Sequence, residues 1–191
     1  GFRKNTESCW QNGQRPEYLK TKENEEKTMA LRTIRIMGDE VLTKTCREVT
    51  KVTPRISNLI DDMLETMYDA CGVGLAAPQV GILKRIVVID IGEGPIVLVN
   101  PEIVEESGEQ TGEEGCLSLP GKYGIVTRPN HVKVRFQDEH MDTVEMEGEG
   151  LLARAFCHEI DHLEGKMYME LAEDGIHDNK YTEEDYLNEE E

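Results

Sequence analysis

Apolar residues recur at helical spacing between Pro54 and Gly72, the most clearly patterned segment of the chain. Thr53 can cap the first turn, and Pro54 suits the first helical position because that position needs no backbone donor. Gly72 stands where a left-handed residue commonly ends a helix. The pattern predicts a helix from 54 to 71 whose buried face is formed by Ile56, Leu59, Ile60, Met63, Leu64 and Met67.

Four later segments carry the signals of β-strands. Residues 86–89 and 96–99 are continuous apolar runs, which predicts strands buried on both faces. Residues 132–136 and 144–147 alternate apolar with charged side chains, which predicts strands with one exposed face.

A second helix is predicted from 150 to 164. Leu151, Leu152, Ala155, Phe156 and Leu163 recur there at helical spacing, and Gly165 follows as a stop signal. Because this helix comes after all the strands, we expect an α+β fold. In that fold, small and mostly antiparallel sheets pack around the helix at the centre.

The length of 191 residues suits one globular domain. We expect this domain to span 29–175, because residues 1–28 are polar and patternless and Met29 is a candidate functional start. Residues 1–28 are interpreted as a disordered or non-native extension, and 176–191 as an acidic tail. The net charge of −18 disfavours nucleic acid and anionic membranes as direct partners, since both repel acid.

Five scattered cysteines without a Cys-x-x-Cys pair indicate free thiols in a reducing cytoplasm. No apolar stretch reaches the roughly 18 residues that a membrane span requires. The N-terminus shows no apolar signal region either. We therefore expect a cytoplasmic protein.

The second predicted helix carries His158, Glu159 and His162 in the pattern His-Glu-x-x-His. Residues four apart lie on one face of a helix, so both imidazoles can bind one metal ion. Glu159 can reach the open side of that ion without being a ligand. The arrangement suits a metal-bound water and its general base.

Two histidines need at least one further ligand. Tyr168 stands where the metzincin proteases place a third histidine, which argues against that family. Downstream, Glu170 or the acidic tail is a candidate; upstream, Cys116 can protrude from a strand end beside the Pro120-Gly121 turn. The residues alone leave this choice open. In function they leave open a peptidase of the His-Glu-x-x-His type and a non-catalytic metal-binding module.

Three motifs, in this order, make the chain resemble the peptide deformylases from about residue 29 to about residue 170. They are Gly72-Val73-Gly74-Leu75-Ala76-Ala77-Pro78-Gln79, Glu114-Gly115-Cys116-Leu117-Ser118 and His158-Glu159-Ile160-Asp161-His162. The resemblance implies removal of the formyl group from the N-terminal methionine of newly made bacterial and organellar polypeptides. It also implies one divalent metal ion, with Fe2+ expected and Zn2+, Ni2+ or Co2+ as substitutes.

The same resemblance implies a role for each matching residue. The metal ligands would be Cys116, His158 and His162. Glu159 would carry a proton from water to the departing amine, while the Gln79 amide and the Leu117 N–H would donate to the oxyanion. A further set is expected to bind the peptide substrate: Val73, Gly74, Gly115 and Leu151.

Two features depart from the family pattern. Arg154 stands where many members carry an apolar residue near the substrate pocket. The chain ends in Glu189-Glu190-Glu191, whereas some members dock on the ribosome through a basic tail. We expect nascent formylmethionyl peptides as partners and, at most, a transient contact with the ribosome.

Overall fold

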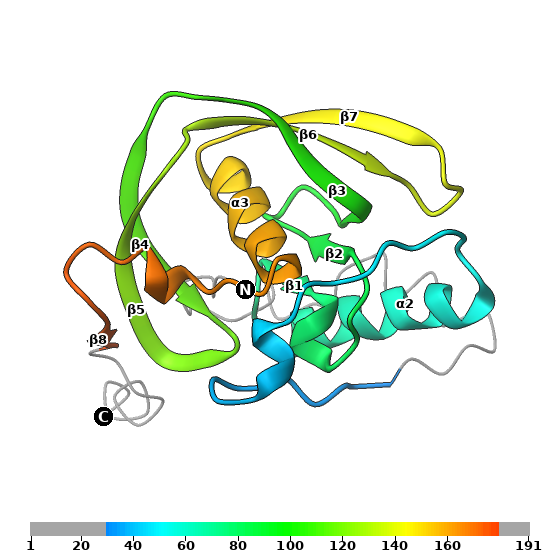
Figure 1. The fold of residues 1–191 in the computed structure, drawn as a ribbon, viewed down its shortest axis with the longest axis horizontal. Coiled ribbons are helices and arrows are strands. Elements are labelled where there is room, and N and C mark those ends of the chain that lie inside the picture. Colours follow the sequence, from blue (N-terminus) through cyan, green and yellow to red (C-terminus); the bar gives the residue numbers. More distant parts are fainter. Residues whose placement is uncertain (1–29, 180–191) are drawn as a thin grey trace, which may run out of the picture.

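The computed structural model describes residues 30–179, and Figure 1 shows their arrangement. The helices and strands of this range follow one another in the order η2 (Glu40–Thr43), α2 (Pro54–Asp69), β1 (Gly74–Ala76), η3 (Ala77–Val80), β2 (Ile86–Ile89), β3 (Ile96–Ser107), β4 (Gln110–Cys116), β5 (Leu119–Arg128), β6 (His131–Gln137), β7 (Thr143–Glu149), α3 (Leu151–Leu163), η4 (Tyr168–Glu170) and β8 (His177–Asp178).

The strands form two antiparallel sheets around α3. One sheet has five strands in the order β1-β2-β3-β6-β7, and the other has three in the order β4-β5-β8. Helix α3 contacts β7, β1, β6 and β2 of the larger sheet and β5 of the smaller one, so that it lies in the middle of the fold (Figure 1). The predicted α+β fold, with small antiparallel sheets around a central helix, is confirmed.

Helix α2 begins as predicted and ends slightly earlier. The Thr53 hydroxyl accepts a hydrogen bond from the Ile56 N–H at 3.4 Å, and the predicted apolar face is packed against β1 and β2. The left-handed residue at the end of the helix is Cys71 (φ 54°) and not Gly72. Gly72 is required for a different reason: a Cβ at this position would lie 2.8 Å from Cδ1 of Leu117.

The four predicted strands correspond to β2, β3, β6 and β7, and β3 runs on to Ser107. Val132, Val134 and Phe136 of β6 are buried while Arg135 between them is exposed, as the alternation predicted. The apolar pattern missed β4 and β5. Their sequences are rich in glycine and charged residues, and the two strands together place only Cys116, Leu119 and Val126 in a core cluster.

Several predictions concern the chain ends, the cysteines and the membrane. The predicted extension 1–28 and all but the first four residues of the predicted acidic tail lie outside the described residues. Cys46, Cys116 and Cys157 form no disulfide, but Cys71 is disulfide-bonded. The prediction of free thiols is therefore wrong at Cys71, because spacing along a chain does not reveal which cysteines meet.

Each helix between residues 30 and 179 is too short or too polar to span a membrane.

The end of α3 is held against the turn that follows η2. The Cys46 N–H donates to the Leu163 carbonyl at 2.8 Å. Gly165 adopts φ +73°, and a Cβ there would lie 2.6 Å from the carbonyl carbon and oxygen of Thr43. Glycine at this position therefore allows both the left-handed backbone and the close approach of the two segments.

Replacing Gly165 with alanine should lower the free energy of unfolding by at least about 2 kcal/mol, because the left-handed backbone and the contact with Thr43 are both disturbed. Gly121→Ala is the matched control, since Gly121 has φ +71° but no atom within 4 Å of the place that a Cβ would occupy. The control should lose only about 1 kcal/mol. Urea unfolding followed by circular dichroism measures both, and equal losses would contradict the importance of the Thr43 contact.

Candidate active site

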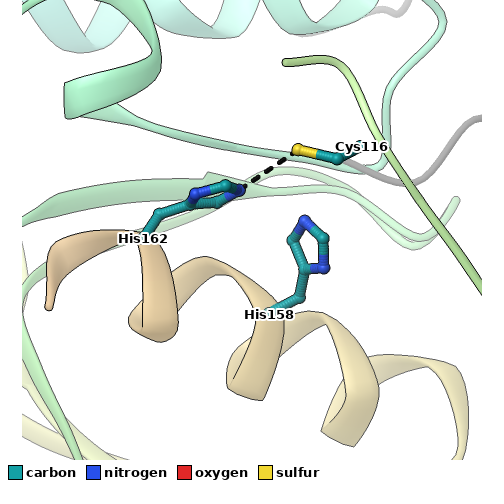
Figure 2. A group of neighbouring side chains, drawn as sticks. All are labelled: Cys116, His158 and His162. Carbon is teal, nitrogen blue, oxygen red and sulfur yellow. Dashed lines mark hydrogen bonds between the residues drawn. The ribbon is translucent and has the colours of Figure 1, made fainter. Parts of the chain in front are cut away.

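Cys116, His158 and His162 meet in the interior of the molecule. One ligand atom from each lies within 4.8 Å of the others, and all three residues are buried. Cys116 Sγ is 3.3 Å from His162 Nε2. Figure 2 shows the sulfur facing the two imidazoles, which rise from successive turns of α3.

Two elements far apart in sequence supply these side chains. His158 and His162 are four residues apart on α3, and their rings meet edge to face with centroids 4.9 Å apart. Cys116 is the last residue of β4, as expected, at a register shift where it pairs with Leu119 of β5. Glu170 caps η4 by accepting from the Met167 N–H at 3.2 Å, and it does not join the cluster.

The cysteine of this cluster favours its charged form. The pKa of the Cys116 thiol lies well below its ordinary value; burial raises this pKa, and the neighbouring His162 and His158 are among the groups that lower it. A thiolate is the form in which cysteine binds a metal ion. Cys46 and Cys157 differ, because burial raises the pKa of both thiols to about 11.

Glu114 lies directly behind His158. Its Oε2 is 3.0 Å from His158 Nδ1, and its Oε1 accepts hydrogen bonds from Arg128 Nε (2.8 Å) and Arg154 Nη1 (3.0 Å). Burial raises the pKa of Glu114, but the hydrogen bonds from His158 and Arg128 outweigh it and hold the pKa at about 2. The carboxylate therefore orients the imidazole so that Nδ1 donates and Nε2 is left for a metal ion.

Arg154 and Asp161 have structural partners near this carboxylate. The Arg154 guanidinium donates to the Val126 carbonyl at 2.9 Å and to the Gln110 carbonyl at 3.0 Å. Arg154 is thus buried and bound to β4 and β5, and its charge is not presented to an apolar pocket. Asp161 accepts from Arg128 at 2.7 Å, so it supports the network one step further from the cluster.

Glu159 is fully buried beside the cluster and in contact with the first glycine-rich motif. A Cβ at Gly74 would lie 2.4 Å from Glu159 Oε1, so only glycine leaves room for the carboxylate in this position. Glycine at position 74 therefore permits the close approach of Glu159 to the backbone of β1.

The Gln79 side chain is fixed at both ends. Its Oε1 accepts from the Ala76 N–H at 2.9 Å, which forces the amide nitrogen toward the cluster. The nitrogen then donates to Ser118 Oγ at 3.1 Å and to Cys116 Sγ at 3.4 Å. Leu117 follows Cys116 and is buried against Gly72. The structure thus brings Gln79 and Leu117 to the same place as the three candidate ligands.

The four expected substrate-binding residues lie at different depths. Val73 and Gly74 are buried before and in β1, whereas Gly115 is half-buried in β4 and pairs with Tyr123. Leu151 is exposed at the first turn of α3, about 10 Å along the helix from His158. The first three therefore lie near the cluster, and Leu151 lies towards the surface.

Three further residues of the site were not predicted from the sequence. Ser118 accepts from Gln79, Arg128 binds Glu114, and the ring of Tyr168 stacks on His158 with centroids 5.9 Å apart. Burial raises the pKa of Tyr168, and the charges of Cys116 and Glu114 raise it further, so its phenol is neutral. Arg128 and Tyr168 carry no local signal, because their partners are distant in sequence.

Known proteins resemble the chain over the same region. The family model described as polypeptide deformylase matches residues 31–175. A peptide deformylase of Agathobacter rectalis is 70% identical over 155 residues, covering 81% of this chain and 98% of the relative. One from Lachnoclostridium phytofermentans is 65% identical over 161 residues, covering 82% and 99%.

Solved structures agree with these relatives. The peptide deformylase of Thermotoga maritima superposes with a TM-score of 0.74 at 44% identity, covering 75% of this chain and 98% of the other. That of Synechococcus elongatus, in complex with actinonin, superposes with a TM-score of 0.72 at 40% identity, covering 77% and 83%.

Replacing Glu114 with glutamine should destabilise the metal-free protein by about 3 kcal/mol at neutral pH, because the buried Arg154 loses its counter-charge and Arg128 keeps only Asp161. Since folding lowers the pKa of Glu114 to about 2, its stabilisation is complete above about pH 4.5 and is lost as the pH falls toward 2. The difference in unfolding free energy between wild type and variant should therefore shrink over that range.

Urea unfolding at a series of pH values measures this difference. Glu113→Gln is the control, because Glu113 is the exposed neighbour on β4, and it should change stability by less than about 0.5 kcal/mol. A difference between wild type and Glu114→Gln that stays constant from pH 6 to pH 3 would be evidence against an ionised Glu114 in the fold.

Proposed function

Since the chain belongs to the polypeptide deformylase family and removes the formyl group from the N-terminal methionine of new polypeptides, we propose that it does so at a metal ion held by Cys116, His158 and His162. The observation that supports this most strongly is the convergence of one sulfur and two imidazole nitrogens within 4.8 Å. Glu159 lies next to His158 on the same helix and is buried with it.

The three side chains fit a divalent transition metal. Bonds of about 2.3 Å to sulfur and about 2.0 Å to imidazole nitrogen place tetrahedral ligand atoms roughly 3.5 Å apart. The 3.3 Å between Cys116 Sγ and His162 Nε2 is close to that spacing. One thiolate and two imidazoles suit several first-row ions, so availability and geometry decide which is bound. We expect Fe2+, with Zn2+, Ni2+ or Co2+ as substitutes; metal analysis of anaerobically purified protein tests this.

The bound ion would act as a Lewis acid toward water and the formyl oxygen. Glu159 takes the proton from the attacking water and gives it to the departing amine. The C–N bond breaks, formate leaves, and the methionyl amine is freed. The amide nitrogen of Gln79, already turned toward the cluster by Ala76, donates to the oxygen that becomes negative, together with the Leu117 N–H.

The sheet edges offer a path for an extended peptide. Gly74 lies in β1 and Gly115 in β4, and each strand is the first in the order of its sheet. Backbone groups at such edges can pair with an added strand. Val73 and Leu151 would contact the methionine side chain and the following residues. Substrate specificity is thus assigned to backbone pairing and an apolar pocket rather than to charged side chains.

The substrate also bears on where the enzyme works. The relatives named above are bacterial, and nascent chains are made in the cytoplasm, so the bacterial cytoplasm is the proposed location. The net charge of −18 would repel ribosomal RNA. Contact with the ribosome is therefore proposed to be transient, with no direct binding of nucleic acid.

Two substitutions separate metal binding from proton transfer. Cys116→Ala should strip most of the metal and abolish turnover, because two histidines alone hold a divalent ion poorly.

Glu159→Gln should keep the metal but lower turnover by about 10²–10⁴-fold, since only the proton carrier is lost. Formate release from formyl-Met-Ala and the metal content per chain measure these effects.

Cys157→Ala is the control, because Cys157 is buried on the same helix but lies outside the cluster, and it should keep its metal. Stoichiometric metal and normal turnover in Cys116→Ala would refute the ligand set. Normal turnover in Glu159→Gln would refute the role of Glu159. Cleavage of an internal peptide bond in place of formate release would favour the peptidase alternative.

Gly74→Ala should lower turnover by about 10²-fold without loss of metal, because its Cβ must displace the Glu159 carboxylate, and a misplacement of about 1 Å has such an effect. Gly112→Ala on β4 is the control, since its Cβ would meet only Arg154 Nη2 at an ordinary 3.5 Å. Equal turnover of the two variants would show that Glu159 does not need the space beside Gly74.

A further inference from the structure

Tyr168 contacts the cluster from a segment that the reaction does not use. It is the first residue of η4 and only 1% exposed. Its ring lies nearly parallel to the His158 imidazole, with centroids 5.9 Å apart and planes inclined by 29°. The aromatic ring therefore covers one face of a proposed metal ligand.

The same ring belongs to the core cluster that contains Cys116, the proposed sulfur ligand. Tyr168 and Cys116 are packed together with Leu42, Leu119, Val126 and Met167. One side chain thus touches His158 of α3 on one side and the surroundings of Cys116, at the end of β4, on the other. These two ligands are 42 residues apart in sequence, and the packed ring adds to the hydrogen bond that joins their side chains.

The hydrogen bond from His158 to Glu114 does not fix the imidazole completely. It holds Nδ1 at 3.0 Å from the carboxylate, and Cys116 forms a side-chain hydrogen bond with the same imidazole. Both contacts are made at the edge of the ring, so they leave its tilt partly free. An aromatic ring stacked on the face removes this freedom. The edge of His162, at an interplanar angle of 79°, then meets an imidazole whose plane is already set.

The hydroxyl group of Tyr168 has a different status from its ring. Its oxygen is buried without a hydrogen-bond partner anywhere in residues 30–179. A buried hydroxyl without a hydrogen-bond partner is destabilising. The stabilising contacts of Tyr168 are therefore those of its ring. This separates the two parts of the side chain experimentally, because phenylalanine keeps the ring alone.

We propose that the ring of Tyr168 is a positioning element of the metal centre, which sets the plane of His158 and its distance from Cys116 and thereby slows release of the bound ion. The inference rests on the ligand set proposed above. Tyr168 touches no substrate in this role. Its effect is on how long the ion stays and on the geometry in which it is held.

The test compares release of cobalt from the full chain to an excess of chelator. Tyr168→Leu should release Co2+ about tenfold faster than wild type, and its visible absorption spectrum should change because the ligand geometry changes. Tyr168→Phe should match wild type in both measurements. Phe156→Leu is the matched control: Phe156 is fully buried on α3 in a core cluster without a ligand, so its variant should lose stability and keep the release rate.

Three outcomes would overturn the proposal. They are a wild-type release rate in Tyr168→Leu, equal acceleration in Phe156→Leu, or equal acceleration in Tyr168→Phe, which would assign the effect to the hydroxyl. If Tyr168→Leu does not fold, Tyr168→Met replaces it; failure of both to fold gives Tyr168 a purely structural role and also overturns the proposal. Cobalt retained by Cys116→Ala would instead refute the ligand set itself.

Discussion

The buried carboxylate of Glu114 is the charge on which the geometry of the active site depends. It joins β4, which carries it, to Arg128 on β5 and to Arg154 and His158 on α3. Ions removed from water are costly unless every hydrogen-bonding group is satisfied. Here one carboxylate accepts hydrogen bonds from two guanidiniums and an imidazole at once. A rotation of α3 or a slip of β4 would break several of these bonds together, so the network specifies a single arrangement.

Close backbone approach is the second constraint on the site. Gly72 admits the Leu117 side chain, and Gly74 admits the carboxylate of Glu159. Both glycines belong to the segment that follows α2. Two hydrogen bonds hold this segment: the Tyr68 hydroxyl donates to Asp90 at 2.7 Å, and the Asp90 N–H donates to the Val73 carbonyl. The position of the Glu159 carboxylate is therefore fixed by the absence of a side chain at Gly74 and by hydrogen bonds far from the metal-site cluster.

The parts of the structure that could be predicted from sequence are those with a local cause. Helical spacing located α2 and α3, and the interval of four residues placed His158 and His162 on one face. The strand ending at Cys116 was expected from the turn beside it, although β4 and β5 themselves were not, because their glycines and charges mask any alternation. The role of Arg154 could not be predicted for a related reason: a charge at a buried helical position is explained only by partners such as Val126, which no local pattern reveals.

The separation of the three proposed metal ligands along the chain has a consequence for the biogenesis of the enzyme. Cys116 and Glu114 are synthesised more than 40 residues before His158 and His162, and chains grow from the N-terminus at a finite rate. Until α3 has been made, the β4–β5 hairpin can pair Glu114 with Arg128 but has neither of the histidines. The growing chain thus carries Cys116 without the two histidines, and the proposed centre can bind its ion only after most of the domain has been made. An enzyme that acts on nascent chains therefore cannot complete its own metal site until late in its synthesis.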